Sequence, residues 1–210
     1  HVRCRRQRQM CIRDSCLIEG GQTMNPSTED MLKAIERVNA ENIFILPNNK
    51  NIIMAAQQAR DLTEDKNIIV IPSRTVPQGI TALVNFMPDL GPEENTRTMT
   101  EEMGNVRTAQ ITYAVRTTNI DGIDIEEGDI MALGDHGILA VGKSVDGVAL
   151  EAMKEMLDDE SELVTIYYGA DVSEHEAKVL EEQAQEQYPD KEIELQYGGQ
   201  PIYYYLISAE

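Results

Sequence analysis

The sequence contains no tryptophan, only two phenylalanines and only three cysteines. Two of the cysteines, Cys4 and Cys11, belong to the first fifteen residues, which differ in composition from the rest of the chain. With Cys16 alone remaining, the chain has no disulfide framework and no CxxC motif, which is consistent with a reducing compartment. We interpret Cys16 as a small buried apolar residue.

Positive charge is also scarce, because 18 basic residues face 37 acidic ones and the formal net charge is -19. Nucleic acids and anionic membranes attract basic surfaces, so neither is expected as the main partner. No apolar run approaches the roughly 20 residues that cross a bilayer, so no transmembrane segment is expected. These features predict a cytoplasmic protein.

The first fifteen residues, "HVRCRRQRQMCIRDS", hold five of the basic residues and only one of the acids. A short transit segment or a functional basic arm would have this composition, and so would translated adapter read-through, which we favour. Residues 1–15 are therefore left out of the fold prediction as an artefactual leader. A strand-like pattern then begins abruptly at "CLIEGG", which predicts that the chain is a fragment of a longer protein.

Outside this leader the chain has few catalytic groups. His136 and His175 are the only histidines of residues 16–210. No HxxxH, HxH or cysteine cluster predicts a metal site, and no GxSxG motif predicts a hydrolase. His136 falls in the predicted turn "GDHGI", and His175 falls in the first turn of a predicted helix. Asp171 is the best-placed single acid, yet nothing beside it supports chemistry. We therefore predict no catalytic residue and no metal ligand.

Two short apolar runs, residues 42–46 and 67–71, each end at a proline. Runs without alternation are typical of strands buried on both faces, as in parallel sheets. Helical spacing of apolar residues precedes, separates and follows them. Together with a strand from residue 16, this order predicts a parallel three-layer α/β lobe over residues 16–92.

Residues 93–210 begin with a linker and a short helix that ends near Met103. Alternating patterns and Asp-Gly, Glu-Gly and His-Gly pairs then predict antiparallel strands, with a hairpin across "DHG". Asp146 is a candidate helix cap, and "SEHE" from Ser173 has capping-box spacing. The fold class is therefore α/β with two lobes, the second being mixed and containing a hairpin.

The stretch "GGQTMNPSTED", residues 20–30, is rich in glycine and small polar residues. Ser27 and Asp30 have capping-box spacing, and Asn25-Pro26 offers an alternative cap. Free N–H groups at the start of a helix also favour an anion. No GxGxxG or GxxxxGK[ST] fingerprint is present, so we interpret this loop as a helix cap first and a ligand or partner loop second.

Each predicted parallel strand of the first lobe ends in a polar loop: "GGQTMNPS", "PNNKN" and "PSRTVPQG". The carboxyl ends of parallel strands meet at one end of a sheet, where open α/β folds bind ligands. We name the polar residues of these loops the rim and predict that they form a binding surface, although short polar turns are also common without a function. The rim consists of Asn25, Ser27, Thr28, Asn48, Asn49, Asn51, Ser73, Arg74, Thr75 and Gln78.

The chain closes with "YGGQPIYYYLISAE", in which Tyr203, Tyr204 and Tyr205 are consecutive. Neighbouring side chains of a strand point to opposite faces, so these three rings cannot share one face. At least one ring is expected at a surface or an interface, where an aromatic ring with a polar tip is favourable. Ordinary packing in an edge strand is the alternative.

Four motifs, "EGGQTMNPSTED", "LPNNKNIIMAAQQA", "VIPSRTVPQGITAL" and "GGQPIYYYLIS", resemble the C-terminal region of the A-type component of bacterial fatty acid kinase. That family is also described as DAK2-domain or dihydroxyacetone kinase-like. The resemblance covers essentially residues 16–210. It implies a two-lobed fold similar to that of DegV proteins and the dihydroxyacetone-binding kinase subunit. Neither His136 nor His175 matches the histidine that binds dihydroxyacetone covalently in that subunit.

The resemblance also implies a division of labour. In the family, an N-terminal domain holds ATP and magnesium through aspartates, and a middle domain carries a Cys/His zinc site. Neither motif occurs in this chain, so no cofactor and no kinase activity are expected of it alone. The C-terminal region is associated with docking the B-type subunit, a DegV-like protein that carries the fatty acid whose carboxylate is phosphorylated.

The leading hypothesis is therefore a non-catalytic module that docks an acyl-carrying B-type subunit through the rim. The alternative is a domain that binds a small molecule or a fatty acyl ligand at the same residues. A homodimer is compatible with either hypothesis.

Overall fold

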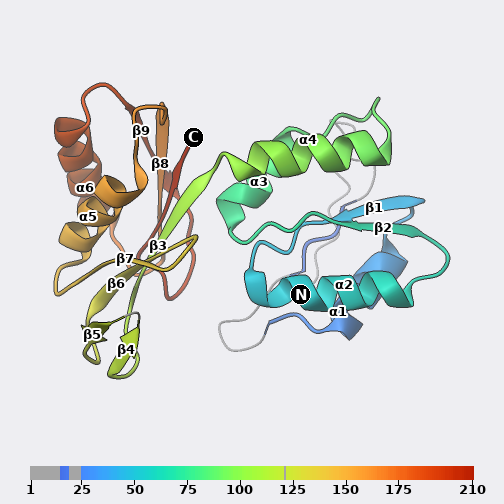
Figure 1. Ribbon diagram of the computed structural model, residues 1–210, viewed down its shortest axis with the longest axis horizontal. Coiled ribbons are helices and arrows are strands. Elements are labelled where there is room, and N and C mark those ends of the chain that lie inside the picture. The colour runs from blue at the N-terminus through green and yellow to red at the C-terminus, as the bar shows by residue number, and fades with distance from the viewer. Residues whose placement is uncertain (1–14, 19–24, 121) are drawn as a thin grey trace. The chain divides into compact units, whose positions relative to one another are not determined.

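The computed structural model describes residues 15–18, 25–120 and 122–210 (Figure 1). Most of the leader and much of the glycine-rich stretch lie outside these ranges. The chain forms two compact units, of which the first ends at Asn105 and the second runs from Val106 to Glu210. The sequence placed the boundary between residues 92 and 93, one helix earlier. The structure assigns that helix to unit 1, where it packs against the preceding helix.

Unit 1 alternates helices with two short strands. Its elements are α1 (Thr28–Arg37), β1 (Asn42–Ile45), α2 (Lys50–Leu62), β2 (Asn67–Val70), α3 (Val76–Val84) and α4 (Pro92–Gly104). β1 and β2 pair in parallel, as predicted. The strand expected from residue 16 is wrong over Cys16–Ile18, which has no strand structure, and residues 19–24 lie outside the described ranges. Cys16 and Ile18 instead pack against the apolar core, which accounts for their apolar pattern without strand pairing.

The two strands of unit 1 separate two helical layers (Figure 1). Ile43 and Ile68 pack with α1 and α2, whereas Phe44 and Ile69 contact the cluster formed by α3 and α4. Because successive side chains point to opposite faces, a strand covered on both faces is apolar at every position. The three-layer arrangement predicted for this lobe is confirmed.

Unit 2 contains a mixed six-stranded sheet. Its elements are β3 (Arg107–Tyr113), β4 (Thr118–Ile120), β5 (Ile123–Ile125), β6 (Ile130–Gly134), β7 (Ile138–Gly142), α5 (Val145–Met156), β8 (Leu163–Tyr168), α6 (Glu174–Gln187), β9 (Glu192–Tyr197) and β10 (Tyr205–Ala209). The strand order is β7-β6-β3-β10-β8-β9, in which only β8 and β9 are parallel neighbours. The hairpin across "DHG" is confirmed as β6 and β7, and β4 and β5 form a separate antiparallel hairpin.

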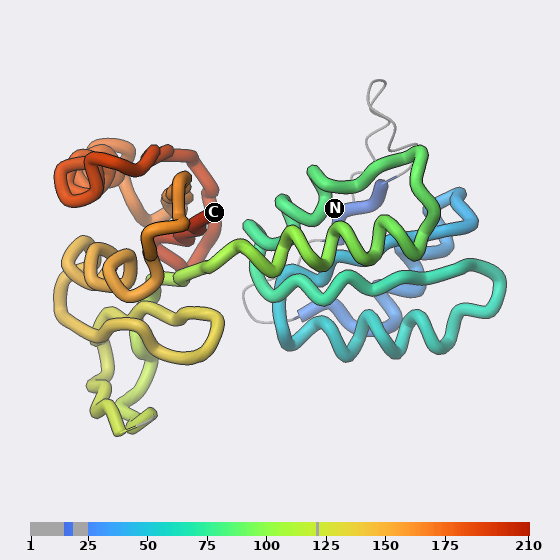
Figure 2. The backbone as a smooth tube through the Cα atoms, turned by 45° about the horizontal axis from the view of Figure 1, so that its top comes forward, coloured from blue at the N-terminus to red at the C-terminus, as the bar shows by residue number. Residues whose placement is uncertain are grey.

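Helices α5 and α6 lie together on one side of the large sheet, as Figure 2 shows. Ser144 caps α5 by accepting a hydrogen bond from the Gly147 amide, so the expectation that Asp146 is the cap is wrong. Asp146 lies in the first helical turn instead. The capping box predicted at Ser173 is confirmed, with Glu176 as its partner. No helix in the described part of the chain combines the length and apolar character needed to span a membrane.

The buried side chain of Asn95 on α4 fixes the connection between α3 and α4. Its Oδ1 atom accepts a hydrogen bond from the Met87 amide at 2.8 Å, and its Nδ2 atom donates to the carbonyl oxygens of Met87 at 2.8 Å and Leu90 at 3.0 Å. Only 1% of the residue is exposed. The side-chain amide therefore adds to the few backbone hydrogen bonds of this loop, such as that from the Leu90 amide to the Met87 carbonyl at 3.1 Å.

We expect Asn95→Ala to lower the free energy of unfolding by about 2–3 kcal/mol, because it removes a buried side chain and leaves the backbone groups of Met87 and Leu90 without the hydrogen bonds that it makes. Urea denaturation followed by circular dichroism measures the change. Asn39→Ala, at an exposed position outside the helices and strands, is the matched control and should alter stability by less than about 0.5 kcal/mol. Equal effects of the two substitutions would contradict this account of the loop.

Candidate functional site

Two of the three predicted rim loops meet directly at the carboxyl ends of β1 and β2. The backbone amide of Asn48 donates a hydrogen bond to Ser73 Oγ at 3.1 Å, and Ser73 Oγ donates one to the side-chain oxygen Asn48 Oδ1 at 2.8 Å. Ser73 is fully buried. This reciprocal pair joins the loop after β1 to the loop after β2, as expected for neighbouring parallel strands.

Asn48 and Gly79 fit together closely in this contact. Asn48 has a φ of 55°, in the left-handed region that asparagine tolerates better than most residues. A Cβ atom built on Gly79 would lie 1.9 Å from Asn48 Oδ1, so the Asn48 side chain occupies the space that a larger residue would need. Gly79 belongs to the first turns of α3, and the contact therefore connects Asn48 to both β2 and α3.

The remaining polar residues of the third loop are used to begin α3. Thr75 is the N-cap and accepts a weak hydrogen bond from the Gln78 amide at 3.5 Å, while Gln78 Oε1 accepts one from the Arg74 amide at 2.9 Å. Pro77 lies in the first turn, as predicted. Thr75 and Gln78 are buried, whereas Arg74 is exposed.

The first loop has a different setting. Ser27 and Asp30 form the predicted capping box, so Ser27 caps α1 and the Asn25-Pro26 alternative is wrong. Thr28 donates a hydrogen bond to Gln58 Oε1 at 3.0 Å, well beyond the start of α2. The first turn of α1 therefore lies along the flank of α2.

Burial divides the rim into three groups. Ser73, Thr75 and Gln78 are 0%, 6% and 9% exposed and serve as internal supports. Asn48 and Asn49 are half-buried, and Asn49 caps α2 by accepting a hydrogen bond from the Asn51 amide at 2.9 Å. The exposed members, which could contact another molecule, are Asn25, Ser27, Asn51 and Arg74.

Sequence reasoning overlooked Gly79 and Gln58, which hold the rim loops and the α1–α2 pair. Gly79 belongs to the quoted motif "VIPSRTVPQGITAL", but a helical glycine alone does not reveal which side chain approaches it. Gln58 is one of several polar residues of α2, and nothing in the sequence distinguishes it.

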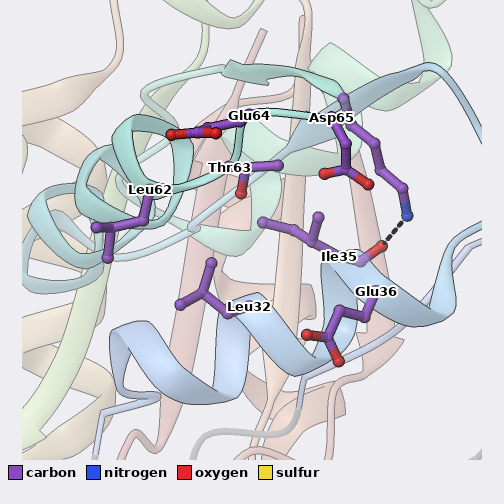
Figure 3. A pocket seen from close by; sticks show the side chains of 8 residues that line it. Leu32, Ile35, Glu36, Leu62, Thr63, Glu64 and Asp65 are labelled. Atoms are coloured by element: carbon purple, nitrogen blue, oxygen red, sulfur yellow. Dashed lines mark hydrogen bonds between the residues drawn. The ribbon is translucent and has the colours of Figure 1, made fainter.

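The opposite end of the small sheet contains a hollow of about 370 Å³ between α1 and the end of α2 (Figure 3). Leu32, Ile35 and Leu62 provide its apolar part, and Glu36, Glu64, Asp65 and the aliphatic stem of Lys66 complete it together with Thr63. Lys66 Nζ donates hydrogen bonds to the carbonyl oxygens of Ile35 at 2.7 Å and Val38 at 2.8 Å. The lysine therefore caps the end of α1, and the hollow keeps three carboxylates at its margin.

A second hollow of about 490 Å³ lies in unit 2 beside the β6–β7 turn and the end of α5. Asp135 accepts hydrogen bonds from the Thr108 amide and hydroxyl, both at 3.0 Å, which joins the turn to β3. His136 is exposed on the turn, and His175 is exposed on α6. In the ranges that the structure describes, no group of three or more His, Cys, Asp or Glu side chains is placed to hold a metal ion.

Strands β3, β7, β8 and β9 of unit 2 all end at the same end of the large sheet. Asp146 of α5, Glu176 of α6 and the buried Tyr205 of β10 lie close together there. Burial raises the pKa of the Asp146 carboxyl, the neighbouring Glu176 carboxylate raises it further, and a hydrogen bond with Tyr205 opposes both effects. Burial also raises the pKa of the Tyr205 hydroxyl, which stays protonated.

A family model for the C-terminal domain of FakA-like proteins, the A-type components of fatty acid kinase, matches residues 13–210. Protein YloV of Bacillus subtilis (strain 168) is 46% identical over 196 residues, which are 93% of this chain and 35% of that protein. An uncharacterized protein of Staphylococcus aureus (strain MRSA252) is 43% identical over 194 residues, which are 92% of this chain and again 35% of that protein. The chain thus spans about a third of the length of these curated relatives.

Solved structures share the fold at low sequence identity. The Streptococcus pneumoniae Fatty Acid Kinase B3 protein, loaded with linoleic acid, is 16% identical with a TM-score of 0.60, covering 88% of this chain and 76% of that one. The DegV family protein Cg2579 of Corynebacterium glutamicum has a TM-score of 0.62 at 12% identity, covering 91% and 86%. The dihydroxyacetone kinase of C. freundii has a TM-score of 0.57 at 14% identity, covering 89% and 41%. The predicted likeness to the DegV and dihydroxyacetone kinase fold is confirmed.

We expect Gly79→Ala to destabilise the protein by about 1–3 kcal/mol, because the new methyl group displaces the Asn48 side chain from Ser73. The same change at Gly104, where nothing lies within 4 Å, should stabilise α4 by up to about 1 kcal/mol. The decisive measurement is a double-mutant cycle with Asn48→Gly. In that background Gly79→Ala should become neutral or stabilising, and an undiminished penalty would show that the contact with Asn48 is not its cause.

Asp146→Asn and Asp30→Asn should change the pH dependence of stability in opposite directions. The raised pKa of Asp146 means that the folded protein binds its proton more tightly than the unfolded chain, so this contribution is present at low pH and lost as pH rises through the folded pKa. Hydrogen bonds from the Ser27 side chain and backbone lower the pKa of Asp30, so its contribution is present above 3.8 and lost as pH falls through the folded pKa.

The free energy of unfolding of Asp146→Asn, relative to that of the parent, should therefore be higher at about pH 7 than at about pH 3. For Asp30→Asn the same difference should be lower at about pH 7 than at about pH 3. Urea denaturation of the three proteins at a series of pH values measures both differences. A common sign for the two substitutions would refute the assignment.

Proposed function

The chain belongs to the FakA-like C-terminal family of fatty acid kinase, and on that premise we propose that it is a non-catalytic docking module. Its partner is an acyl-carrying B-type subunit with the DegV fold. The complex presents the fatty acid carboxylate to a separate ATP- and magnesium-binding domain, which phosphorylates it. In this proposal the chain contributes recognition, and another part of the longer protein contributes the chemistry.

The observation that carries the proposal is the combination of family and fold. The family match concerns the C-terminal part of one fatty acid kinase component, whereas the fold is that of fatty-acid-binding proteins, including a fatty acid kinase B protein. Charged side chains line both hollows described above, which suits polar contacts with a protein better than burial of an acyl chain. These hollows support docking over the alternative of direct acyl binding.

The rim provides a first set of contacts for this docking. Its buried members hold the loops in one conformation, and a preformed surface loses less entropy on binding. Arg74 is the exposed cation of the rim and follows directly on the buried Ser73. We propose Arg74 and the exposed amide of Asn51 as the rim residues that contact the partner.

The chain should bind one or more of the DegV-family proteins encoded in the same genome, each loaded with oleic acid, in isothermal titration calorimetry. Arg74→Ala should weaken that complex by about five- to tenfold, because one interfacial charge is lost. Arg97→Ala, which removes an exposed arginine from α4, is the matched control and should leave affinity unchanged.

Two companion measurements separate the alternatives. Native mass spectrometry of the chain with oleic acid should show no bound acyl chain, whereas a stoichiometric adduct would favour the ligand-binding function. Sedimentation velocity of the chain alone shows whether it forms a homodimer. Failure to bind any DegV-family protein at tens of micromolar would overturn the proposed docking function.

A further inference from the structure

Seven of the eight tyrosines gather at one end of the six-stranded sheet in unit 2. β3, β8 and β9 end there and β10 begins there, with Tyr205 opposite Tyr168 and Tyr168 opposite Tyr197. We name this group the tyrosine end. It consists of Tyr113, Tyr167, Tyr168, Tyr197, Tyr203, Tyr204 and Tyr205.

The rings of the tyrosine end run from the core to the surface. Tyr205 is 1% exposed and belongs to the core, whereas Tyr113 and Tyr197 are 40% and 68% exposed. The rings of Tyr168 and Tyr197 are 5.1 Å apart, and those of Tyr113 and Tyr204 are 6.2 Å apart. Each exposed ring therefore rests on a half-buried ring that fixes its position.

Hydrogen bonds hold the loop between β9 and β10 firmly at this end. Ala170 donates its amide to the Gln200 carbonyl at 3.0 Å, and Thr112 Oγ1 donates to the Ile202 carbonyl at 3.1 Å. A Cβ atom on Gly169 would lie 2.2 Å from the Tyr203 carbonyl oxygen, so the two loops touch through their backbones.

Ile202 has a φ of 71°, which is strained for a β-branched residue and persists only where the surroundings impose it. This strain shows that the loop is held in one shape. A surface held in this way meets a partner without the cost of ordering it.

Several carboxylates lie at the same end of the sheet as these rings. Helices α5 and α6 begin at the same end of the sheet, and their first turns contain Asp146, Glu174 and Glu176. Asp171, in the loop before α6, is exposed and forms no ion pair within the described ranges. Lys178 forms an ion pair with Glu174 at 2.6 Å. Within the described part of unit 2, Asp146, Asp171 and Glu176 form no ion pair with a lysine or an arginine.

We propose that the tyrosine end is a second docking surface, which takes an arginine-bearing surface of the B-type subunit. This inference rests on the proposed docking function and adds a contact that the rim does not provide. A guanidinium group can stack on a tyrosine ring and pair with a carboxylate, so exposed tyrosines that share one end of a sheet with acids are suited to a surface bearing arginine. Tyrosine and arginine are also enriched where protein interfaces concentrate their binding energy.

The first test compares two substitutions at one exposed ring. Tyr197→Ala should weaken the complex with the oleate-loaded B-type subunit by roughly tenfold or more in isothermal titration calorimetry. Tyr197→Phe keeps the ring and should retain affinity within about threefold. Val84→Ala is the control, because Val84 is 76% exposed but lies at the end of α3 in unit 1 and lines neither hollow, and it should leave affinity unchanged.

The second test concerns charge. Asp171→Asn should weaken the complex and make its affinity less dependent on salt concentration, because one pair with the partner is lost. Asp89→Asn, an exposed acid of unit 1, is the matched control. Each variant is first compared with the parent by circular dichroism and urea denaturation, so that a folding defect is recognised.

The outcomes separate this inference from the docking function on which it rests. If the parent and Tyr197→Ala bind the B-type subunit with equal affinity, the tyrosine end is not a docking surface, whereas the docking function itself stands. Equal losses for Tyr197→Ala and Tyr197→Phe would overturn the stacking contact. No binding by the parent to any B-type subunit would overturn both proposals.

Discussion

The reciprocal hydrogen bonds between Asn48 and Ser73 are the constraint on which the arrangement of unit 1 depends. They join the loops that follow β1 and β2, so a sheet of only two described strands receives a cross-connection at its carboxyl end. Gly79 extends the connection to α3, because the Asn48 side chain lies against its Cα. A parallel pair of four-residue strands has little pairing of its own, and such side-chain bonds supplement it.

The sequence predicted much of this fold because its local patterns and its global packing agree. The uniformly apolar runs of β1 and β2 indicated coverage on both faces, and helical layers lie on both. The capping boxes at Ser27 and Ser173 act over three residues and were therefore visible in sequence. Cys16–Ile18 was misassigned because apolar residues can enter a core without pairing as a strand. Burial alone does not specify a strand.

The candidate site was harder to predict than the fold, because loop composition does not reveal which polar groups are used internally. Ser73 and Gln78 have the side chains expected of ligand contacts, yet both are buried supports of their own loops. Arg74 lies between them in sequence and is exposed. A polar loop at the end of a strand must first satisfy its own backbone, and only the remaining groups are available for binding. The predicted rim therefore contains both a scaffold and a smaller contact surface.

The two units stabilise unusual backbone conformations at different cost, and the difference bears on function. In unit 1 the residue with a positive φ is Asn48, and asparagine tolerates this conformation. The Asn48 side chain also forms the hydrogen bond that connects the two loops. In unit 2 it falls on Ile202, where a β-branched side chain makes the same region unfavourable. Asparagine or glycine at this position would relieve the strain, so local stability does not account for isoleucine. The bonds from Thr112 and the close approach of Gly169 hold the strained loop in place. Strain maintained by its surroundings is typical of surfaces whose shape matters, which gives the tyrosine end the stronger structural basis for recognition.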